Sequence, residues 1–306
     1  MRASSQQAKT SAEHKAKHQA TNKDKDLTMT TPASTPARTS PRTVALPGGL
    51  TVTIQEFGEN TEGEGVLILH GGAGPRTVAG ISAALSEHVY VVTPTHPGFD
   101  GTPRPERFDT VADLAIAYLD LLDTLDLKNV MVIGNSVGGW IAAEMALRDN
   151  KGRIGALTLL NAVGIHAHMV ENRVVDPRTM APSDVSQLSF ANAKFRPDFA
   201  SFTDEQRAAA GANQKTLAVY GGDHFTYDPK LRARLHRVTV PVLVVWGEED
   251  GIAPLKYGRG YADAFPNGHF APIADAAHFP QIEQLGATLG AIGNFVSTVV
   301  KPGETD

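Results

Sequence analysis

Short runs of apolar residues recur along the chain between residues 66 and 246. Continuous or nearly continuous runs occur at 66–69, 89–92, 130–133, 156–160 and 242–246. Strands that are apolar at almost every position are typical of a parallel sheet covered on both faces. Residues 50–55 instead alternate apolar and polar side chains, which predicts a strand with one covered face. The Pro47-Gly-Gly sequence before them predicts a hairpin turn.

Between these runs the apolar spacing changes to a helical period. Residues 110–125 are the clearest case, because Thr110 precedes the apolar stripe and Asp113 stands three positions later, as in a capping box. A second helix is predicted after residue 137, and a last one from Pro280, a residue suited to a first helical turn. Strands that alternate with helices predict an α/β fold with a mostly parallel central sheet and helices on both faces.

This alternation stops after about residue 164 and resumes at residue 241. Residues 165–232 are polar, contain several prolines and have only weak helical patterns. We predict that they form a helical cap inserted over the carboxyl edge of the sheet. The α/β core then consists of residues 44–164 and 233–301, and residues 302–306 form a short carboxyl-terminal tail.

Residues 1–43 differ in composition from the rest of the chain. They contain no Phe, Trp, Tyr, Val or Ile, so they bury too little apolar surface to offset the entropy of ordering, and we expect a disordered tail. Eight of the 28 basic and three of the 33 acidic residues lie there, which gives the tail a formal charge of +5 and the remainder −10. Because acidic residues stand among the lysines, we favour a solvated basic tail over an arm that binds nucleic acid or anionic lipid.

Cysteine is absent from the chain, which excludes disulfide bonds and thiolate metal sites and fits a reducing compartment. No apolar run resembles a signal peptide or reaches the length of a transmembrane helix. We therefore expect a cytoplasmic protein with a small-molecule substrate, no nucleic-acid partner and no membrane span. The composition gives no indication of an oligomeric state.

One serine stands at a corner where a predicted strand meets a predicted helix. The sequence Gly134-Asn-Ser-Val-Gly138 follows the apolar run 130–133, and helical spacing begins at Val137. Glycines two positions before and after Ser136 remove side chains that would collide across so sharp a turn. Strand, Gly-x-Ser-x-Gly and helix together are typical of a nucleophile elbow, so we predict that Ser136 is a catalytic nucleophile.

A serine nucleophile needs a base, and the base needs a carboxylate that orients it. In α/β sheets ligands bind outside the carboxyl ends of the strands, so the partners should lie just after strands. Asp250 follows the run 242–246, and His278 lies in the loop before the last helix. We predict that Asp250 is the acid and His278 the base.

Other residues compete for these two roles. Glu248 and Glu249 are rivals for the acid because they stand in the same turn as Asp250. The end of the strand after the elbow is another position for an acid, but Asn161 stands there and does not ionise. His269 is a weak rival for the base, since Gly268 before it indicates a turn that leads into a strand.

Residues 44–301 resemble the α/β-hydrolase superfamily, in its serine-hydrolase branch with a helical cap. The resemblance rests on His70-Gly-Gly, on Gly134-Asn-Ser-Val-Gly-Gly139, on Gly247-Glu-Glu-Asp250 with Pro254, and on Ala277-His278. It implies an α/β-hydrolase fold, a nucleophile–acid–base order along the chain and no cofactor. It also implies an oxyanion hole made by the backbone N–H groups of Gly72 and Val137. The start of a helix at Val137 favours negative charge there.

The resemblance implies hydrolysis of an ester-type substrate through an acyl-enzyme. Gly134-Asn-Ser with a second glycine at 139 also resembles the meta-cleavage C–C hydrolases, which cut diketones with the same triad. Those enzymes hold a substrate carboxylate with an arginine of the cap, and the candidates here are Arg173, Arg178, Arg196 and Arg207. Cofactor-free perhydrolysis is a further alternative, and a small-molecule receptor on the same fold is the non-enzymatic one. Epoxide hydrolases and dehalogenases need an aspartate where Ser136 stands.

We expect the substrate pocket between the elbow and the cap, with a mostly apolar wall. Candidate wall residues, for each of which core packing is an equal alternative, are Trp140, Phe99 and Tyr220, together with His166, Phe225 and Tyr227. Two pairs, His166 with His168 and Asp223 with His224, have spacings compatible with metal binding. Neither has a third ligand at a suitable spacing, so we predict no metal site.

Overall fold

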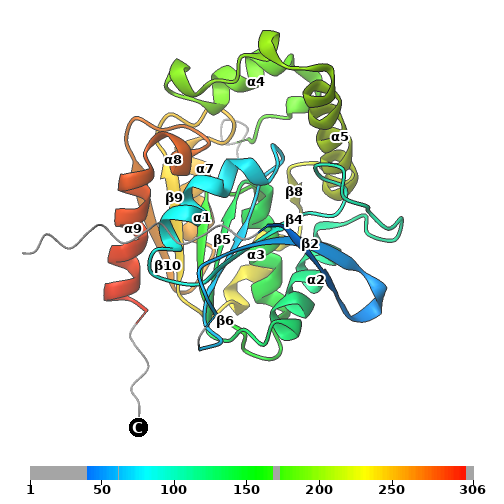
Figure 1. The fold of residues 1–306 in the computed structure, drawn as a ribbon. Coiled ribbons are helices and arrows are strands. Elements are labelled where there is room, and N and C mark those ends of the chain that lie inside the picture. Colours follow the sequence, from blue (N-terminus) through cyan, green and yellow to red (C-terminus); the bar gives the residue numbers. More distant parts are fainter. Residues whose placement is uncertain (1–39, 61, 168–172, 301–306) are drawn as a thin grey trace, which may run out of the picture. The chain divides into compact units, whose positions relative to one another are not determined.

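A mixed sheet occupies the centre of the computed structural model, which describes residues 40–60, 62–167 and 173–300 (Figure 1). In this described part the sheet has eight strands in the order β1-β2-β4-β3-β5-β6-β9-β10. The pairs from β4 to β10 are parallel, whereas β1–β2 and β2–β4 are antiparallel. The strands are β1 (Arg42–Ala45), β2 (Thr51–Phe57), β3 (Val66–Leu69), β4 (Val91–Thr95), β5 (Val130–Asn135), β6 (Ile154–Leu160), β9 (Val242–Gly247) and β10 (Gly268–Ile273).

Helices cover both faces of this sheet, which confirms the predicted fold class. Successive side chains of β3 point to opposite faces: Leu67 and Leu69 pack in one apolar cluster, and Val66 and Ile68 in the other. The first cluster includes residues of α2 (Val111–Thr124), α3 (Val137–Arg148) and α7 (Leu255–Ala262). The second includes residues of α1 (Ala79–Leu85) and α9 (Leu285–Thr298).

Hydrogen-bonding partners rather than apolar runs set the bounds of β1 and β4. β1 begins at Arg42, two residues before the expected start of the core, and the Arg42 guanidinium pairs with Glu56 on β2, Nη2 to Oε1 at 2.9 Å. β4 runs over Val91–Thr95 instead of 89–92, because Thr93 and Thr95 pair with β2. The remaining residues of the predicted tail, 1–39, and residues 301–306 lie outside the described residues.

The last predicted helix is divided into two. α8 (Pro280–Glu283) ends at Gln284, which has the non-helical angles φ −135° and ψ 55°, and α9 follows. The two parts bury different side chains: α8 buries the polar Gln281 and Glu283, whereas α9 buries Ile292 and Phe295 against the sheet.

The described residues of 165–232 form short helices together with one small sheet. The helices are α4 (Pro182–Ser189), α5 (Asp204–Gly221) and α6 (Leu231–Arg234), with one 3-10 turn before α4 and two between α4 and α5. β7 (Gly164–Ile165) and β8 (Tyr227–Asp228) pair in parallel and bring the start and end of the segment together. Figure 1 shows α4 and α5 beyond one end of the sheet, where Tyr220 Oη of α5 donates to Pro97 O after β4, at 2.9 Å.

Candidate active site

Ser136 occupies a strained turn between β5 and α3. Its φ of 54° and ψ of −118° are rarely adopted by a residue other than glycine. A Cβ on Gly134 would lie 2.3 Å from Gly138 O, and a Cβ on Gly138 would lie 2.3 Å from Leu69 O. Both glycines are therefore required by close backbone contacts. Ser136 N donates to Leu160 O at 3.0 Å, which ties the turn to β6.

Asp250 and His278 are hydrogen-bonded to each other close to this turn. Asp250 follows β9, and its Oδ2 lies 2.9 Å from His278 Nδ1, with both side chains buried. Asn161 Nδ2 donates to the same Oδ2 at 2.7 Å, and the N–H groups of Ile252 and Ala253 donate to Oδ1 at 2.8 and 3.1 Å. Hydrogen bonds therefore satisfy both oxygens of this buried carboxylate.

The partners of His278 define its tautomer. An ionised carboxylate only accepts hydrogen bonds, so Nδ1 of His278 carries the proton and Nε2 remains an acceptor. Asn135 Nδ2 donates to His278 O at 3.1 Å and to Leu160 O at 3.1 Å, so the residue before Ser136 holds the loop of the base against the turn. Among the described residues no hydrogen bond joins the Ser136 hydroxyl to His278.

The rival residues are placed elsewhere. Glu248 and Glu249 are exposed, and their backbone N–H groups bond to Ile273 O and Ala276 O. His269 is exposed on the edge strand β10, with its ring beside Phe295. Asn161 stands at the alternative acid position and acts as a donor to Asp250. The carboxylate in contact with His278 is that of Asp250.

The loop after β3 lies on the other side of Ser136. A Cβ on Gly71 would lie 3.1 Å from Ser136 Cβ and 3.1 Å from Asn135 Oδ1, so the backbone passes directly beside the turn. A Cβ on Gly72 would lie 2.5 Å from Leu217 Cδ2 of α5. Glycine at both positions therefore allows the loop to lie between the serine turn and α5. Val137 is buried at the start of α3.

The stacked imidazoles of His70 and His96 support this loop. The rings of His70 and His96 lie 3.7 Å apart, and both are fully buried. His96 Nε2 donates to His70 O at 2.8 Å, while His96 N–H donates to His70 Nε2 at 3.1 Å. Tyr118 Oη donates to His96 Nδ1 at 2.5 Å, and His70 Nδ1 donates to Gly71 O at 2.7 Å.

Both rings of this pair are neutral. Burial lowers the pKa of His70 to about 4, and burial lowers the pKa of His96 well below its ordinary value, with the neighbouring His70 adding to the effect. Each ring nitrogen has one hydrogen-bond partner, so neither imidazole has to be protonated to complete the network. The sequence did not identify His96 or Tyr118 as members of this network.

Known proteins share the sequence pattern and the fold of this chain. Residues 66–289 match the model of the alpha/beta hydrolase family. The chain belongs to this family. It is 24% identical over 279 residues to a 2-hydroxy-6-oxo-2,4-heptadienoate hydrolase of Pseudomonas putida, covering 83% of this chain and 95% of that protein.

Solved structures share the fold of this hydrolase. One is a serine hydrolase involved in carbazole degradation, with a TM-score of 0.65 and 24% identity, covering 85% of this chain and 99% of the other. Another is a bacterial membrane phospholipase A, with a TM-score of 0.70 and 19% identity, covering 86% and 87%. Among the described residues, no helix of this hydrolase has the length and apolar character that a membrane crossing requires.

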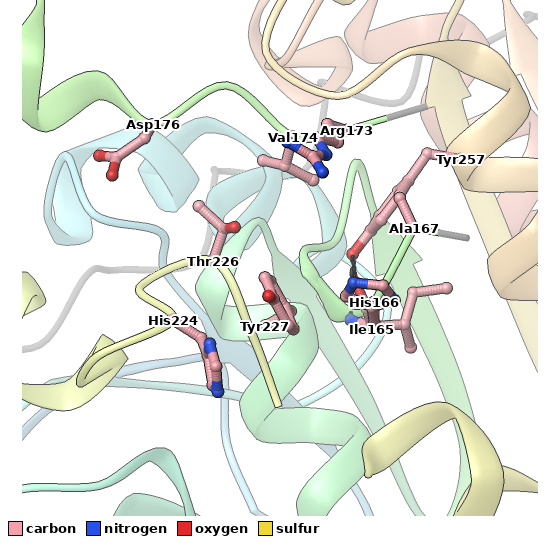
Figure 2. Close-up of a pocket in the computed structure, with 10 residues that line it drawn as sticks. All are labelled: Ile165, His166, Ala167, Arg173, Val174, Asp176, His224, Thr226, Tyr227 and Tyr257. Carbon is pink, nitrogen blue, oxygen red and sulfur yellow. Dashed lines mark hydrogen bonds between the residues drawn. The ribbon is translucent and has the colours of Figure 1, made fainter. Parts of the chain in front are cut away.

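The expected pocket residues are only partly found around a cavity. Phe99, Trp140 and Tyr220 are buried in the apolar core and do not line the cavity of about 270 Å³ in Figure 2. His166 and Tyr227 do line it, with ring centroids 4.8 Å apart. None of Ser136, Asp250 and His278 is among its lining residues.

The four candidate arginines have different surroundings. Arg178 pairs with Asp176 and lies over the ring of the buried Phe225, 4.3 Å from its centroid. Arg196 donates to Phe190 O, and Arg207 donates to Asp204. Arg173 is exposed, lines the cavity and has no hydrogen-bond partner among the residues that the structure describes (Figure 2).

The two residue pairs with spacings compatible with metal binding are only partly described. His166 lines the cavity, but His168 lies outside the described residues. Asp223 and His224 are exposed, and the His224 ring stacks on Tyr227 at 4.9 Å. Over residues 40–60, 62–167 and 173–300, no group of three His, Cys, Asp or Glu side chains is arranged to hold a metal ion.

Proposed function

We propose that this hydrolase cleaves an ester-type substrate through an acyl-enzyme formed on Ser136. The observation that most supports the proposal is the 2.9 Å hydrogen bond between Asp250 Oδ2 and His278 Nδ1, held beside the strained turn of Ser136. It leaves Nε2 of His278 as the acceptor that a serine nucleophile requires. Ser136, Asp250 and His278 are thus the proposed nucleophile, acid and base.

The reaction proceeds in two acyl-transfer steps. The Ser136 hydroxyl oxygen attacks the ester carbonyl carbon while His278 Nε2 takes the hydroxyl proton. Collapse of the adduct breaks the bond to the alcohol oxygen, and that oxygen receives the proton from His278. Water then adds to the acyl carbon, again with proton transfer to His278, and the second collapse releases the acid and returns the proton to Ser136. Asp250 stays ionised and stabilises the imidazolium.

The backbone N–H groups of Gly72 and Val137 are the proposed oxyanion hole. The close approach of Gly71 to Ser136 and the position of Val137 at the first residue of α3 support this assignment. Positive charge at a helix start stabilises the developing oxyanion. Each such donor contributes about 10²–10³ in rate.

Residues 165–232 are the proposed cap, and residues 44–164 with 233–301 the proposed core. Contacts of two cap helices with loops at the carboxyl ends of strands support this division. Tyr220 and Thr216 of α5 donate to Pro97 O and Gly98 O, at 2.9 and 3.0 Å. The last two residues of α4, Leu188 and Ser189, accept from backbone N–H groups in the loops of Asp250 and His278.

Hydrolysis of a carbon–carbon bond in a ring-cleavage product is the second candidate function. The relative named 2-hydroxy-6-oxo-2,4-heptadienoate hydrolase supports it, as does Arg173, whose guanidinium has no described partner. For this function, Arg173→Ala raises KM for a 2-hydroxy-6-oxo-2,4-dienoate about tenfold and leaves KM for p-nitrophenyl acetate unchanged. Arg207→Ala, which removes an arginine paired with Asp204, is the control. An unchanged KM for the dienoate in Arg173→Ala contradicts a role of Arg173 in binding it.

A fluorophosphonate probe tests the proposed mechanism. The wild-type protein becomes labelled, Ser136→Ala does not, and Ser183→Ala, at an exposed serine of α4, labels like the wild type. The kcat for p-nitrophenyl esters falls by about 10⁴–10⁶ in Ser136→Ala. A wild-type protein without labelling, as expected of a receptor, or a labelled Ser136→Ala variant would overturn the proposal. Comparing p-nitrophenyl esters with a dienoate separates the two candidate reactions.

A further inference from the structure

A short stretch of the proposed cap contacts both loops that carry the acid and the base. We call residues 188–192 the bridging segment; it begins near the end of α4. Leu188 O accepts from Gly251 N at 3.0 Å, next to Asp250, and Ser189 O accepts from the backbone N–H of His278 at 3.0 Å. The Phe190 ring stacks on Phe279 with a centroid distance of 5.0 Å. The bridging segment thus borders the Asp250–His278 pair directly.

A buried carboxylate completes this contact. Glu283 is 8% exposed, its Oε2 accepts from Ala277 N at 2.8 Å, and its Oε1 accepts from Asn192 N at 2.9 Å. Ala277 immediately precedes His278, and Asn192 ends the bridging segment. No ion pair involves Glu283 among the described residues, so these two N–H groups are its stabilising partners there. Burying a carboxylate is unfavourable unless such donors compensate it.

We propose that Glu283 is a positioning residue, whose carboxylate joins the loop of His278 to the bridging segment and so makes the orientation of the imidazole depend on the cap. This inference rests on the proposed function, in which His278 is the base. Five hydrogen bonds connect Asp250, His278, Glu283 and the bridging segment. Glu283 accepts two of them, the bridging segment accepts two from the loops of Asp250 and His278, and the fifth joins Asp250 to His278.

A simple helix-capping role does not account for these contacts. A capping side chain binds the first N–H groups of its own helix. Glu283 is the last residue of α8, and its partners are Ala277, which precedes that helix, and Asn192, which is 91 positions away in the chain. The carboxylate therefore connects two elements that the proposed mechanism needs in fixed relation.

Because Glu283 contacts the backbone next to the base, its loss affects the reaction rather than substrate binding. Misplacement of a reacting group by about 1 Å reduces rate by about 10². We expect Glu283→Ala to lower kcat for p-nitrophenyl acetate by about 10- to 100-fold, with KM within about twofold of wild type. Glu283→Gln retains one oxygen as an acceptor, so its kcat is intermediate.

The cap side of the same contact is tested at Asn192. Asn192→Pro removes the N–H that binds Glu283, and we expect a fall in kcat comparable to that of Glu283→Gln. Asn192→Ala removes only the side chain, which accepts from Lys194 N, and serves as the matched control with kcat near wild type. Thermal unfolding and circular dichroism of each variant identify any that fail to fold.

A second measurement does not depend on turnover. The Nδ1 proton of His278, bound to Asp250, gives a low-field proton NMR signal, which we expect to broaden or shift in Glu283→Ala and Asn192→Pro but not in Asn192→Ala. Wild type that does not react with a fluorophosphonate would overturn the proposed function and this inference with it. Wild type that reacts, together with unchanged kcat and an unchanged His278 signal in folded Glu283→Ala, would overturn the inference alone.

Discussion

The two sides of Ser136 are supported by different kinds of interaction. On one side, the buried carboxyl group of Asp250 takes part in four hydrogen bonds, and His278 is held through its backbone by Asn135 and the bridging segment. On the other side, the stacked and neutral imidazoles of His70 and His96 hold the His70-Gly-Gly loop in the core.

This difference follows from what each side does in the proposed mechanism. The acid–base side accepts and returns a proton, so it needs a charged group with fixed donors around it. The oxyanion side only presents N–H groups, and a rigid neutral support keeps those donors in place through the reaction. We therefore expect loss of charge on the acid–base side to have the largest effect on kcat. On the oxyanion side we expect changes in pH and packing to affect the free energy of unfolding.

The largest expected effect is on the acid–base side. Asp250→Asn replaces an acceptor by a group that can donate to Nδ1, which favours the tautomer of His278 with its proton on Nε2. That tautomer does not take the proton of Ser136, so kcat for p-nitrophenyl acetate falls by about 10⁴. Steady-state kinetics measures this change.

Glu248→Gln and Glu249→Gln provide the controls for Asp250→Asn. Both glutamates are exposed in the same turn, so their kcat values stay within about twofold of wild type. A large loss of kcat in either control, with Asp250→Asn close to wild type, would assign the acid to a rival residue.

A smaller effect, on stability, is expected on the oxyanion side. The folded-state pKa of His70 is about 4, below its ordinary value of 6.5, so the unfolded chain binds more protons between these pH values. The free energy of unfolding is therefore highest above about pH 6.5 and falls as the pH drops toward 4, by about 3 kcal/mol from His70. Urea denaturation at a series of pH values measures this loss.

Carboxylates also contribute to that pH dependence, so the difference between variants is the quantity to compare. In His70→Asn the free energy of unfolding should fall less steeply below pH 6.5 than in wild type. His88→Ala, at an exposed histidine, should retain the wild-type slope. Parallel curves for wild type and His70→Asn would contradict the neutral, buried state of His70.

The smallest expected effect concerns the contact of α5 with the oxyanion loop. Leu217→Ala removes methyl groups beside Gly72, and because Leu217 is only partly buried the free energy of unfolding falls by about 1 kcal/mol. The added space should raise the ratio of kcat/KM for p-nitrophenyl pivalate to that for p-nitrophenyl acetate a few-fold. Val219→Ala, at an exposed position of α5, leaves the ratio unchanged. An unchanged ratio in Leu217→Ala would indicate that the acyl group lies elsewhere.

Periodic patterns were sufficient to predict most of the core. β3, β5, α2 and α3 were found where apolar runs and helical spacing had placed them, because burial selects side chains with the period of the element. The capping box at Thr110 and Asp113 is present, since it depends on residues three positions apart. The divided last helix was missed because Glu283 and Gln281 bind Asn192 and Thr77, which are distant in the chain.

For the candidate site, the sequence by itself singled out Ser136 and its glycines, because a Gly-x-Ser-x-Gly corner between a strand and a helix is a local pattern. It selected Asp250 and His278 by their place after strands. Only the tertiary structure decided what surrounds them. Leu188, Ser189 and Asn192 contribute only backbone atoms, so no sequence pattern predicts these contacts. The same holds for the stacking of His70 on His96, since the sequence does not state which buried groups become neighbours.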